Sequence, residues 1–164
     1  MHPAALPLDE LLRHTRELHA RRSGPGGQHR NKTQTAVILV HEPTGIQAEA
    51  NERRSQAENR RVAVARLRLK LALDHRTPTT PDPSPLWLSR ARGRRLVVAA
   101  DHDDYPSLIA EALDRLQAHG FLIPPAAEAL GVTASQLTRL FTKSPPAWTR
   151  LNRLREAAGL PLLR

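Results

Sequence analysis

The 164-residue sequence has no cysteine, which excludes disulfide scaffolds, cysteine–zinc sites and thiol catalysis. Aromatic side chains make up only 3% of the chain, so its core must be built mostly from leucine, valine, isoleucine and alanine. No apolar run approaches the roughly 18 residues that a membrane-spanning helix needs. The N-terminus also lacks the basic and then apolar pattern of a signal peptide. We therefore expect a soluble, cytoplasmic protein.

Acidic side chains are too few to balance the basic ones, and the formal net charge is +9 at neutral pH. Such an excess on a small protein attracts polyanions, either nucleic acid or an anionic membrane surface. Most of the basic residues are arginine, whose planar guanidinium favours bidentate contacts with phosphate.

Four prolines in the nine residues 77–85 divide the chain, because this stretch cannot continue a helix or a central strand. We expect an N-terminal domain over residues 1–76, a proline-rich linker over 77–85 and a mostly helical C-terminal module over 86–164. The N-terminal part carries 14 basic and 8 acidic side chains, and the part after residue 76 carries 11 and 8. Anion binding is therefore expected mainly in the N-terminal part.

The N-terminal part alternates short elements with turns. The pattern predicts a helix over 8–16, an extended stretch over 18–22, and strands over 35–40 and 46–51 that pair as an antiparallel hairpin. Ser55 and Glu58 form a capping box for a helix over 56–75. Residues 66–71 alternate apolar and basic side chains as a strand would, but the cap, the length and the alanines favour a helix covered on two sides.

The C-terminal part predicts one more strand over 94–99, a helix over 107–119 that ends at Gly120, and three shorter helices over 124–130, 134–143 and 145–158. Thr133 and Gln136 form a second capping box. The fold class expected from the whole pattern is α+β, with a small sheet packed on one long helix and followed by helices.

The most informative segment for chemistry is SGPGGQHRNKT at residues 23–33, where three glycines precede an amide, an imidazole and two cations. Glycines let backbone N–H groups approach a phosphate or a developing oxyanion. An ordinary surface loop has the same composition. The spacing matches neither a phosphate-binding P-loop nor a dinucleotide fingerprint.

Residues 18–76 closely resemble the GGQ domain of class I peptide chain release factors and of their short ribosome-rescue relatives, the peptidyl-tRNA hydrolases of the ArfB and release factor H type. The shared features are the GGQ tripeptide, the HxNK that follows it, the hairpin with its PTG turn, and the RRSQxxN that begins the helix. The resemblance implies a sheet packed on one long helix, with the GGQ loop at its tip.

The resemblance implies that water hydrolyses the ester between the nascent peptide and the 3′-terminal ribose of tRNA in the ribosomal peptidyl-transferase centre. Gly26 and Gly27 would let the loop enter that centre. The backbone N–H of Gln28 would stabilise the transition-state oxygen, and its side chain would exclude other nucleophiles. A glutamine methyltransferase acting on Gln28 is an implied partner, and neither a cofactor nor a metal ion is expected.

Two polar groups are expected to contact ribosomal RNA. One flanks the tripeptide and the other begins the long helix, where exposed arginines could also be a solvated face. These residues are Ser23, His29, Arg30, Asn31, Lys32, Arg53, Arg54, Gln56, Asn59, Arg60 and Arg61.

Two further patterns support weaker hypotheses. His102 and Asp104 could suggest a metal site, but no second ligand pair has zinc-like spacing, so loop and capping roles are expected. Residues 126–141 resemble a helix-turn-helix. If that segment bound DNA, its exposed readers would be Ser135, Gln136, Thr138 and Arg139; a packing module has the same pattern.

The function expected from the sequence is codon-independent hydrolysis of peptidyl-tRNA on stalled ribosomes, because the chain has no room for the stop-codon-reading domain of full release factors. The ArfB type carries a basic disordered tail, whereas this sequence ends in capped helices. The alternative is a non-enzymatic RNA- or DNA-binding regulator built on the helix-turn-helix-like segment.

Overall fold

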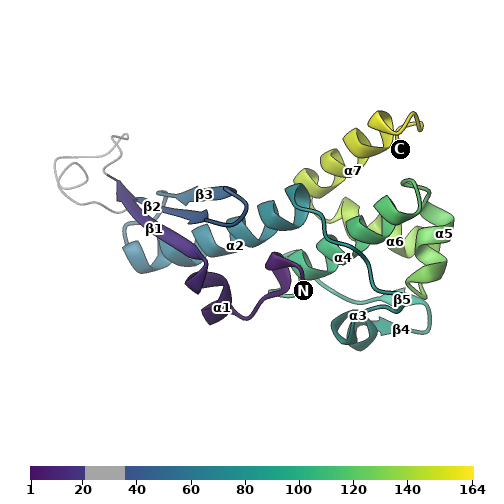
Figure 1. The fold of residues 1–164 in the computed structure, drawn as a ribbon, viewed down its shortest axis with the longest axis horizontal. Coiled ribbons are helices and arrows are strands. Elements are labelled where there is room, and N and C mark those ends of the chain that lie inside the picture. The colour runs from purple at the N-terminus through teal and green to yellow at the C-terminus, as the bar shows by residue number, and fades with distance from the viewer. Residues whose placement is uncertain (21–35) are drawn as a thin grey trace.

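The computed structural model describes residues 1–20 and 36–164, and it confirms the α+β class (Figure 1). The sheet lies at one end of the molecule, the long helix α2 runs from it, and helices α4 to α7 gather at the other end. The elements are η1 Pro3–Ala5, α1 Leu8–Arg13, β1 Thr15–Ala20, β2 Ala36–His41, β3 Gln47–Ala50, α2 Gln56–Asp74, α3 Pro85–Arg90, β4 Ala91–Arg92, β5 Arg95–Leu96, α4 Tyr105–Ala118, α5 Ile123–Ala129, α6 Ala134–Thr142 and α7 Pro145–Ala157.

The N-terminal sheet is antiparallel with the order β1-β2-β3. The predicted hairpin is confirmed, since Val40 pairs with Gln47 and the strands pair back to Ala50. The predicted helix over 8–16 ends earlier, at Arg13, and the extended stretch begins at Thr15 rather than residue 18. The strand begins earlier because β2 continues to His41, and Thr15 pairs with His41 across the two strands.

Helix α2 confirms the long helix predicted after Ser55. The Ser55 hydroxyl accepts a hydrogen bond from the Glu58 backbone N–H at 3.4 Å, which satisfies one of the free donors of the first turn. Leu67 and Leu71 are fully buried, and α2 contacts β2 and β3 as well as α4 and η1. A helix covered by a sheet and by other helices needs leucines around much of its circumference, which explains the strand-like alternation of residues 66–71.

In place of the strand predicted over 94–99, the structure has a short hairpin in which β4 and β5, of two residues each, pair with each other. Gly93 and Arg94 both have positive φ, 54° and 64°, and together make the tight turn between the strands. Arg94 is the residue that the local pattern does not predict there, because a side chain with a Cβ rarely adopts this conformation.

The C-terminal helices lie close to their predicted positions. Helix α4 begins two residues earlier than predicted, at Tyr105, with Pro106 in its first turn. Gly131, with φ of 67°, follows α5 and allows the turn into α6. The second capping box forms only in part: the Thr133 hydroxyl accepts from the Gln136 backbone N–H at 3.2 Å, but the Gln136 side chain binds Leu96 instead.

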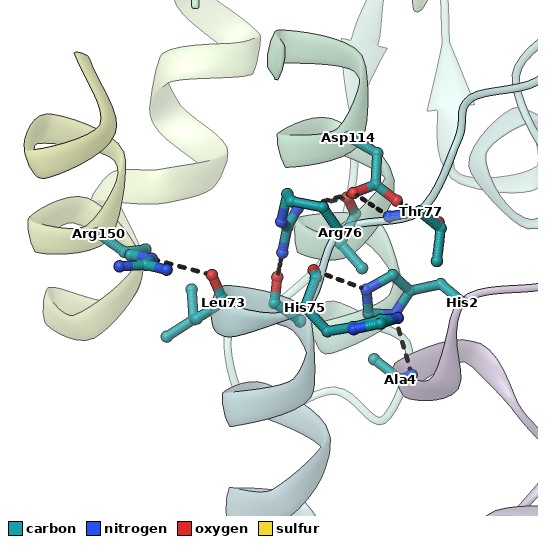
Figure 2. Close-up of polar contacts among 10 residues, drawn as sticks. His2, Ala4, Leu73, His75, Arg76, Thr77, Asp114 and Arg150 are labelled. Carbon is teal, nitrogen blue, oxygen red and sulfur yellow. Dashed lines mark hydrogen bonds and ion pairs between the residues drawn. The ribbon is translucent and has the colours of Figure 1, made fainter. Parts of the chain in front are cut away.

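A partly buried network of polar contacts joins the end of α2 to the C-terminal helices (Figure 2). The Asp114 carboxylate on α4 accepts from Arg76 Nη1 at 3.0 Å, from the Thr77 backbone N–H at 3.1 Å and from the Thr77 hydroxyl at 2.6 Å. Arg150 on α7 donates to the Leu73 carbonyl at 3.0 Å. One continuous set of buried apolar residues runs from Ala4 to Leu151. The division into 1–76, 77–85 and 86–164 stays a prediction.

The N-terminus belongs to the same network through His2, which is 8% exposed. His2 Nδ1 accepts from the Ala4 backbone N–H at 3.0 Å, so Nε2 carries the proton and donates to the His75 carbonyl at 3.1 Å. Burial is the largest effect on the imidazole and lowers the pKa of His2. His2 is therefore a neutral side chain that fastens the N-terminus to the end of α2.

Candidate functional site

Strand β1 ends and strand β2 begins at the same edge of the sheet, where Ala20 pairs with Ala36. The chain leaves the described part at Ala20 and returns to it at Ala36 (Figure 1). The segment between them, 21–35, lies outside the described residues, and it contains the predicted catalytic residues and the first predicted RNA-binding group. Those residues are Ser23, Gly26, Gly27, Gln28, His29, Arg30, Asn31 and Lys32.

The start of α2 lies at this same edge, against strand β1. The Gln56 amide lies 2.7 Å from His19 Nδ1, and Arg60 Nε donates to the Glu17 carboxylate at 2.8 Å. Gln56 and Arg60 are four residues apart and share one helix face, while alternate residues share one face of a strand. Two contacts therefore fix the first turns of α2 next to the point where the strands pass into segment 21–35.

Asn59 fixes the loop that leads into α2. Its side chain is fully buried, accepts from the Arg53 backbone N–H at 2.9 Å and donates to the Arg53 carbonyl at 2.9 Å. A pair of bonds to one residue holds that backbone as a strand partner would. The observed role of Asn59 is thus to position Arg53, and the RNA contact predicted for its side chain stays a prediction.

Three arginines leave an unneutralised positive charge at this edge. Arg53, Arg54 and Arg61 are exposed, and within the described residues none of them forms an ion pair. Arg60 differs, because Glu17 neutralises it. The amino end of a helix adds a partial positive charge of its own. The surface beside Ala20 and Ala36 can therefore bind an anion such as a phosphate.

Glu52 restrains the start of the loop over 51–55, where the chain leaves β3. Its carboxylate accepts from the Asn51 backbone N–H at 2.8 Å and pairs with Arg66 at 2.5 Å, and Arg66 also donates to the Glu49 carbonyl at 2.8 Å. The backbone hydrogen bonds, Asn51 first, lower the pKa of Glu52. The loop over 51–55 is thus attached to the helix and to β3.

Local sequence patterns missed the partners Glu17, His19, Glu52 and Arg66. Glu17 and His19 alternate on a strand, which is a sequence pattern of one shared face, but their partners on α2 are 43 and 37 residues away. Only the packing of α2 across the sheet brings them together.

In residues 1–20 and 36–164, no three histidine, aspartate or glutamate side chains lie close enough together to hold a metal ion. The pair His102 and Asp104, the metal candidate from the sequence, binds Arg90 instead: Asp104 accepts from Arg90 Nε at 2.9 Å, and the His102 ring lies 3.1 Å from the same guanidinium. Across the same described ranges, no helix is long and apolar enough to cross a membrane.

Comparison with known proteins finds relatives of the N-terminal part of the chain. Residues 13–84 match the family model of the RF-1 domain. The chain is similar to mitochondrial peptide chain release factor 1-like from Mus musculus, at 51% identity over 55 residues that make up 34% of this chain and 15% of that protein. Two bacterial proteins give the same result: peptide chain release factor 1 of Ureaplasma parvum, at 53% identity over 51 residues, and peptide chain release factor 2 of Variovorax paradoxus, at 56% over 55.

These matches cover 31% and 34% of this chain and 14% and 15% of those two bacterial relatives. The chain therefore spans a small part of the length of the curated relatives it matches. A three-stranded antiparallel sheet on one long helix, with a basic edge, defines the class of domain. Over residues 13–84 the chain is therefore similar to the RF-1 domain of class I peptide chain release factors.

Proposed function

We propose that this protein hydrolyses the ester of peptidyl-tRNA on stalled ribosomes without reading a codon. The main support is the GGQ tripeptide at residues 26–28, which stands within the segment that matches the RF-1 domain. The relatives that share this segment at 51–56% identity are named peptide chain release factors. The proposed site of action is the ribosome of the cytoplasm.

In the proposed reaction, water attacks the ester carbonyl carbon and the bond from that carbon to the 3′-oxygen of the tRNA ribose breaks. The products are the free peptide acid and tRNA with a 3′-hydroxyl. Gly26 and Gly27 would give the backbone access to the peptidyl-transferase centre. The Gln28 backbone N–H would stabilise the oxyanion, and the Gln28 side chain would favour water over other nucleophiles.

The basic edge beside Ala20 and Ala36 would supply the RNA contacts. Arg53, Arg54 and Arg61 are exposed and free of ion pairs among the described residues, which is the arrangement that phosphate binding requires. Gln56 and Arg60 hold the helix against β1, and in this proposal they contact RNA from that fixed position. Asn59 would act by positioning Arg53.

Codon independence follows the resemblance to the short rescue factors and needs its own test. Purified ribosomes carrying labelled peptidyl-tRNA would be stalled on an mRNA that ends in the P site, or on mRNAs with a stop codon or a sense codon in the A site. The proposal predicts release on the truncated mRNA, with no dependence on which codon is present on the longer ones. Release that requires a stop codon would contradict it.

The alternative, a nucleic-acid-binding regulator without hydrolytic activity, makes the opposite prediction for Gln28→Ala. If the protein is a hydrolase, Gln28→Ala should abolish peptide release and leave ribosome binding intact. If it is a regulator, the substitution should change neither its binding nor its activity. The matched control is Gln117→Ala, an exposed glutamine of α4. Mass spectrometry of the protein from its own host tests methylation of Gln28, the modification expected of the methyltransferase partner.

A further inference from the structure

The hairpin β4–β5 carries three arginines with no carboxylate beside them. Arg92 and Arg95 lie opposite each other in the register, and Arg94 occupies the turn between them. All three are exposed, and the part of the chain that the structure describes gives none of them an ion pair. Like charges directly opposite on paired strands destabilise a hairpin. This hairpin therefore carries a concentration of charge that an anion would relieve.

Contacts with α6 hold the hairpin in place. The Arg94 carbonyl accepts from the Thr133 backbone N–H at 3.2 Å, and the Leu96 backbone N–H donates to the Gln136 side-chain oxygen at 3.3 Å. Leu96 is 7% exposed, so the second strand is anchored in the core. These contacts hold Arg94 in a left-handed backbone conformation, with φ of 64°, which a residue with a Cβ rarely adopts. The arginines are therefore presented from a fixed backbone.

A hollow of about 780 Å³ lies between this hairpin, residues 97–102 and α6. Its lining includes four cations: Arg90, Arg95, Arg139 and Lys143. Asp104 neutralises Arg90, whereas Arg95, Arg139 and Lys143 have no carboxylate partner among the described residues. Lys143 donates to the Val98 carbonyl, and burial together with Arg139 lowers the pKa of Lys143. We call these residues, with Arg92 and Arg94, the basic groove.

The groove argues against the DNA-reading mode suggested by the helix-turn-helix-like sequence. In that mode the first turns of the second helix enter the major groove. Here the hairpin binds both Thr133 and Gln136 at the start of α6, and Gln136, predicted to be an exposed reader, is half-buried. The prediction of an exposed Gln136 is therefore wrong, because its amide serves as the acceptor for Leu96.

We propose that the basic groove binds the phosphodiester backbone of RNA and gives the protein a second RNA contact, separate from the edge next to Ala20 and Ala36. Guanidinium groups bind phosphate oxygens in pairs, and several of them along one groove follow a backbone better than a single small anion. Val97, 60% exposed beside the groove, offers an apolar contact for a ribose or base. The choice of RNA rests on the proposed function.

The test measures binding of the full chain to a fluorescein-labelled RNA stem-loop of about 20 nucleotides by anisotropy, over salt concentrations from about 50 to 200 mM. The variant is Arg92→Ala with Arg95→Ala. The matched control is Arg153→Ala with Arg164→Ala, which removes the same charge from other exposed positions. The groove variant should weaken binding about tenfold at 100 mM salt and lower the slope of log Kd against log salt by about 1.5. The control should weaken binding by no more than about threefold and change the slope by no more than about 0.5.

Equal weakening in both variants would overturn the groove, because it would show a response to net charge alone. No binding by the wild type, or tighter binding to a DNA duplex of the same length than to the RNA, would overturn it as well. Thermal unfolding checks the fold: the groove variant removes two like charges that face each other, so its Tm should not fall. A wild type that binds the RNA through these arginines but releases no peptide would overturn the proposed hydrolase and support the groove.

Discussion

Asn59 should determine the stability of the loop that carries the candidate RNA-binding arginines. Replacing it with alanine removes two hydrogen bonds of 2.9 Å to the Arg53 backbone. Each contributes about 1 kcal/mol net, and the fully buried site also loses the packing of the amide. We expect Asn59→Ala to lower the free energy of unfolding by about 2–3 kcal/mol. For a chain of this size that corresponds to a Tm lower by about 4–12 °C.

Asn59→Asp separates the two bonds. A carboxylate can still accept from the Arg53 N–H, but it cannot donate to the Arg53 carbonyl, and it places a charge in a buried site. At neutral pH this variant should be at least as unstable as Asn59→Ala. In acid a protonated carboxyl can donate again, so the gap between Asn59→Asp and the wild type should narrow as pH falls.

Urea unfolding followed by circular dichroism measures the change in the free energy of unfolding for both variants. The control is Gln117→Ala, an exposed amide side chain on α4. A loss below about 0.5 kcal/mol for Asn59→Ala would refute the argument, since that is the range of ordinary surface substitutions. So would an Asn59→Asp deficit that does not change with pH.

Three other predictions concern the rest of the fold. Asp114→Ala should lower the free energy of unfolding by about 3–5 kcal/mol, because it leaves the Arg76 guanidinium without its ion-pair partner at a site where Arg76 is 18% and Asp114 6% exposed. Denaturant unfolding measures this change, and a loss under about 1 kcal/mol would contradict the pairing. Burial lowers the pKa of His2, so below the ordinary histidine pKa of about 6.5 the unfolded chain binds a proton that the folded chain does not. The free energy of unfolding should therefore decrease as the pH is lowered, by at most about 1.4 kcal/mol per pH unit. His2→Gln should flatten this part of the plot of stability against pH, and an unchanged plot would argue against a neutral His2. Thr133→Ala removes the cap of α6 and should cost about 1 kcal/mol in the same unfolding assay, whereas the exposed Thr149→Ala should cost less than half of that.

Helix α2 shows what the sequence can predict. Ser55 and Glu58 mark its start, and the leucines of residues 67 and 71 are buried on a helix covered on two sides, as expected from the alternation. Features of this kind depend on residues a few positions apart. The same local information predicts the helix starts near Pro124 and Pro145 and the turn at Gly131.

The elements that differ from prediction depend on distant partners. Strand β1 begins at Thr15 because His41 lies opposite it, and the hairpin at residues 91–96 needs Arg94 in a left-handed turn that contacts with α6 hold in place. At the candidate site, the polar group that begins α2 could be predicted from its composition. The burial of Asn59 and the pairing of Arg60 with Glu17 could not, because they arise only when α2 packs across the sheet.

The most direct test of the central proposal is the rate of peptide release from ribosomes stalled on a truncated mRNA, compared between the wild type, Gln28→Pro and Gln117→Ala. Proline has no backbone N–H, so Gln28→Pro removes the proposed oxyanion donor and should slow release by about 100-fold or more while ribosome binding persists. Gln117→Ala should match the wild type. Equal rates for all three proteins, or no release by the wild type from ribosomes that it binds, would contradict the hydrolase.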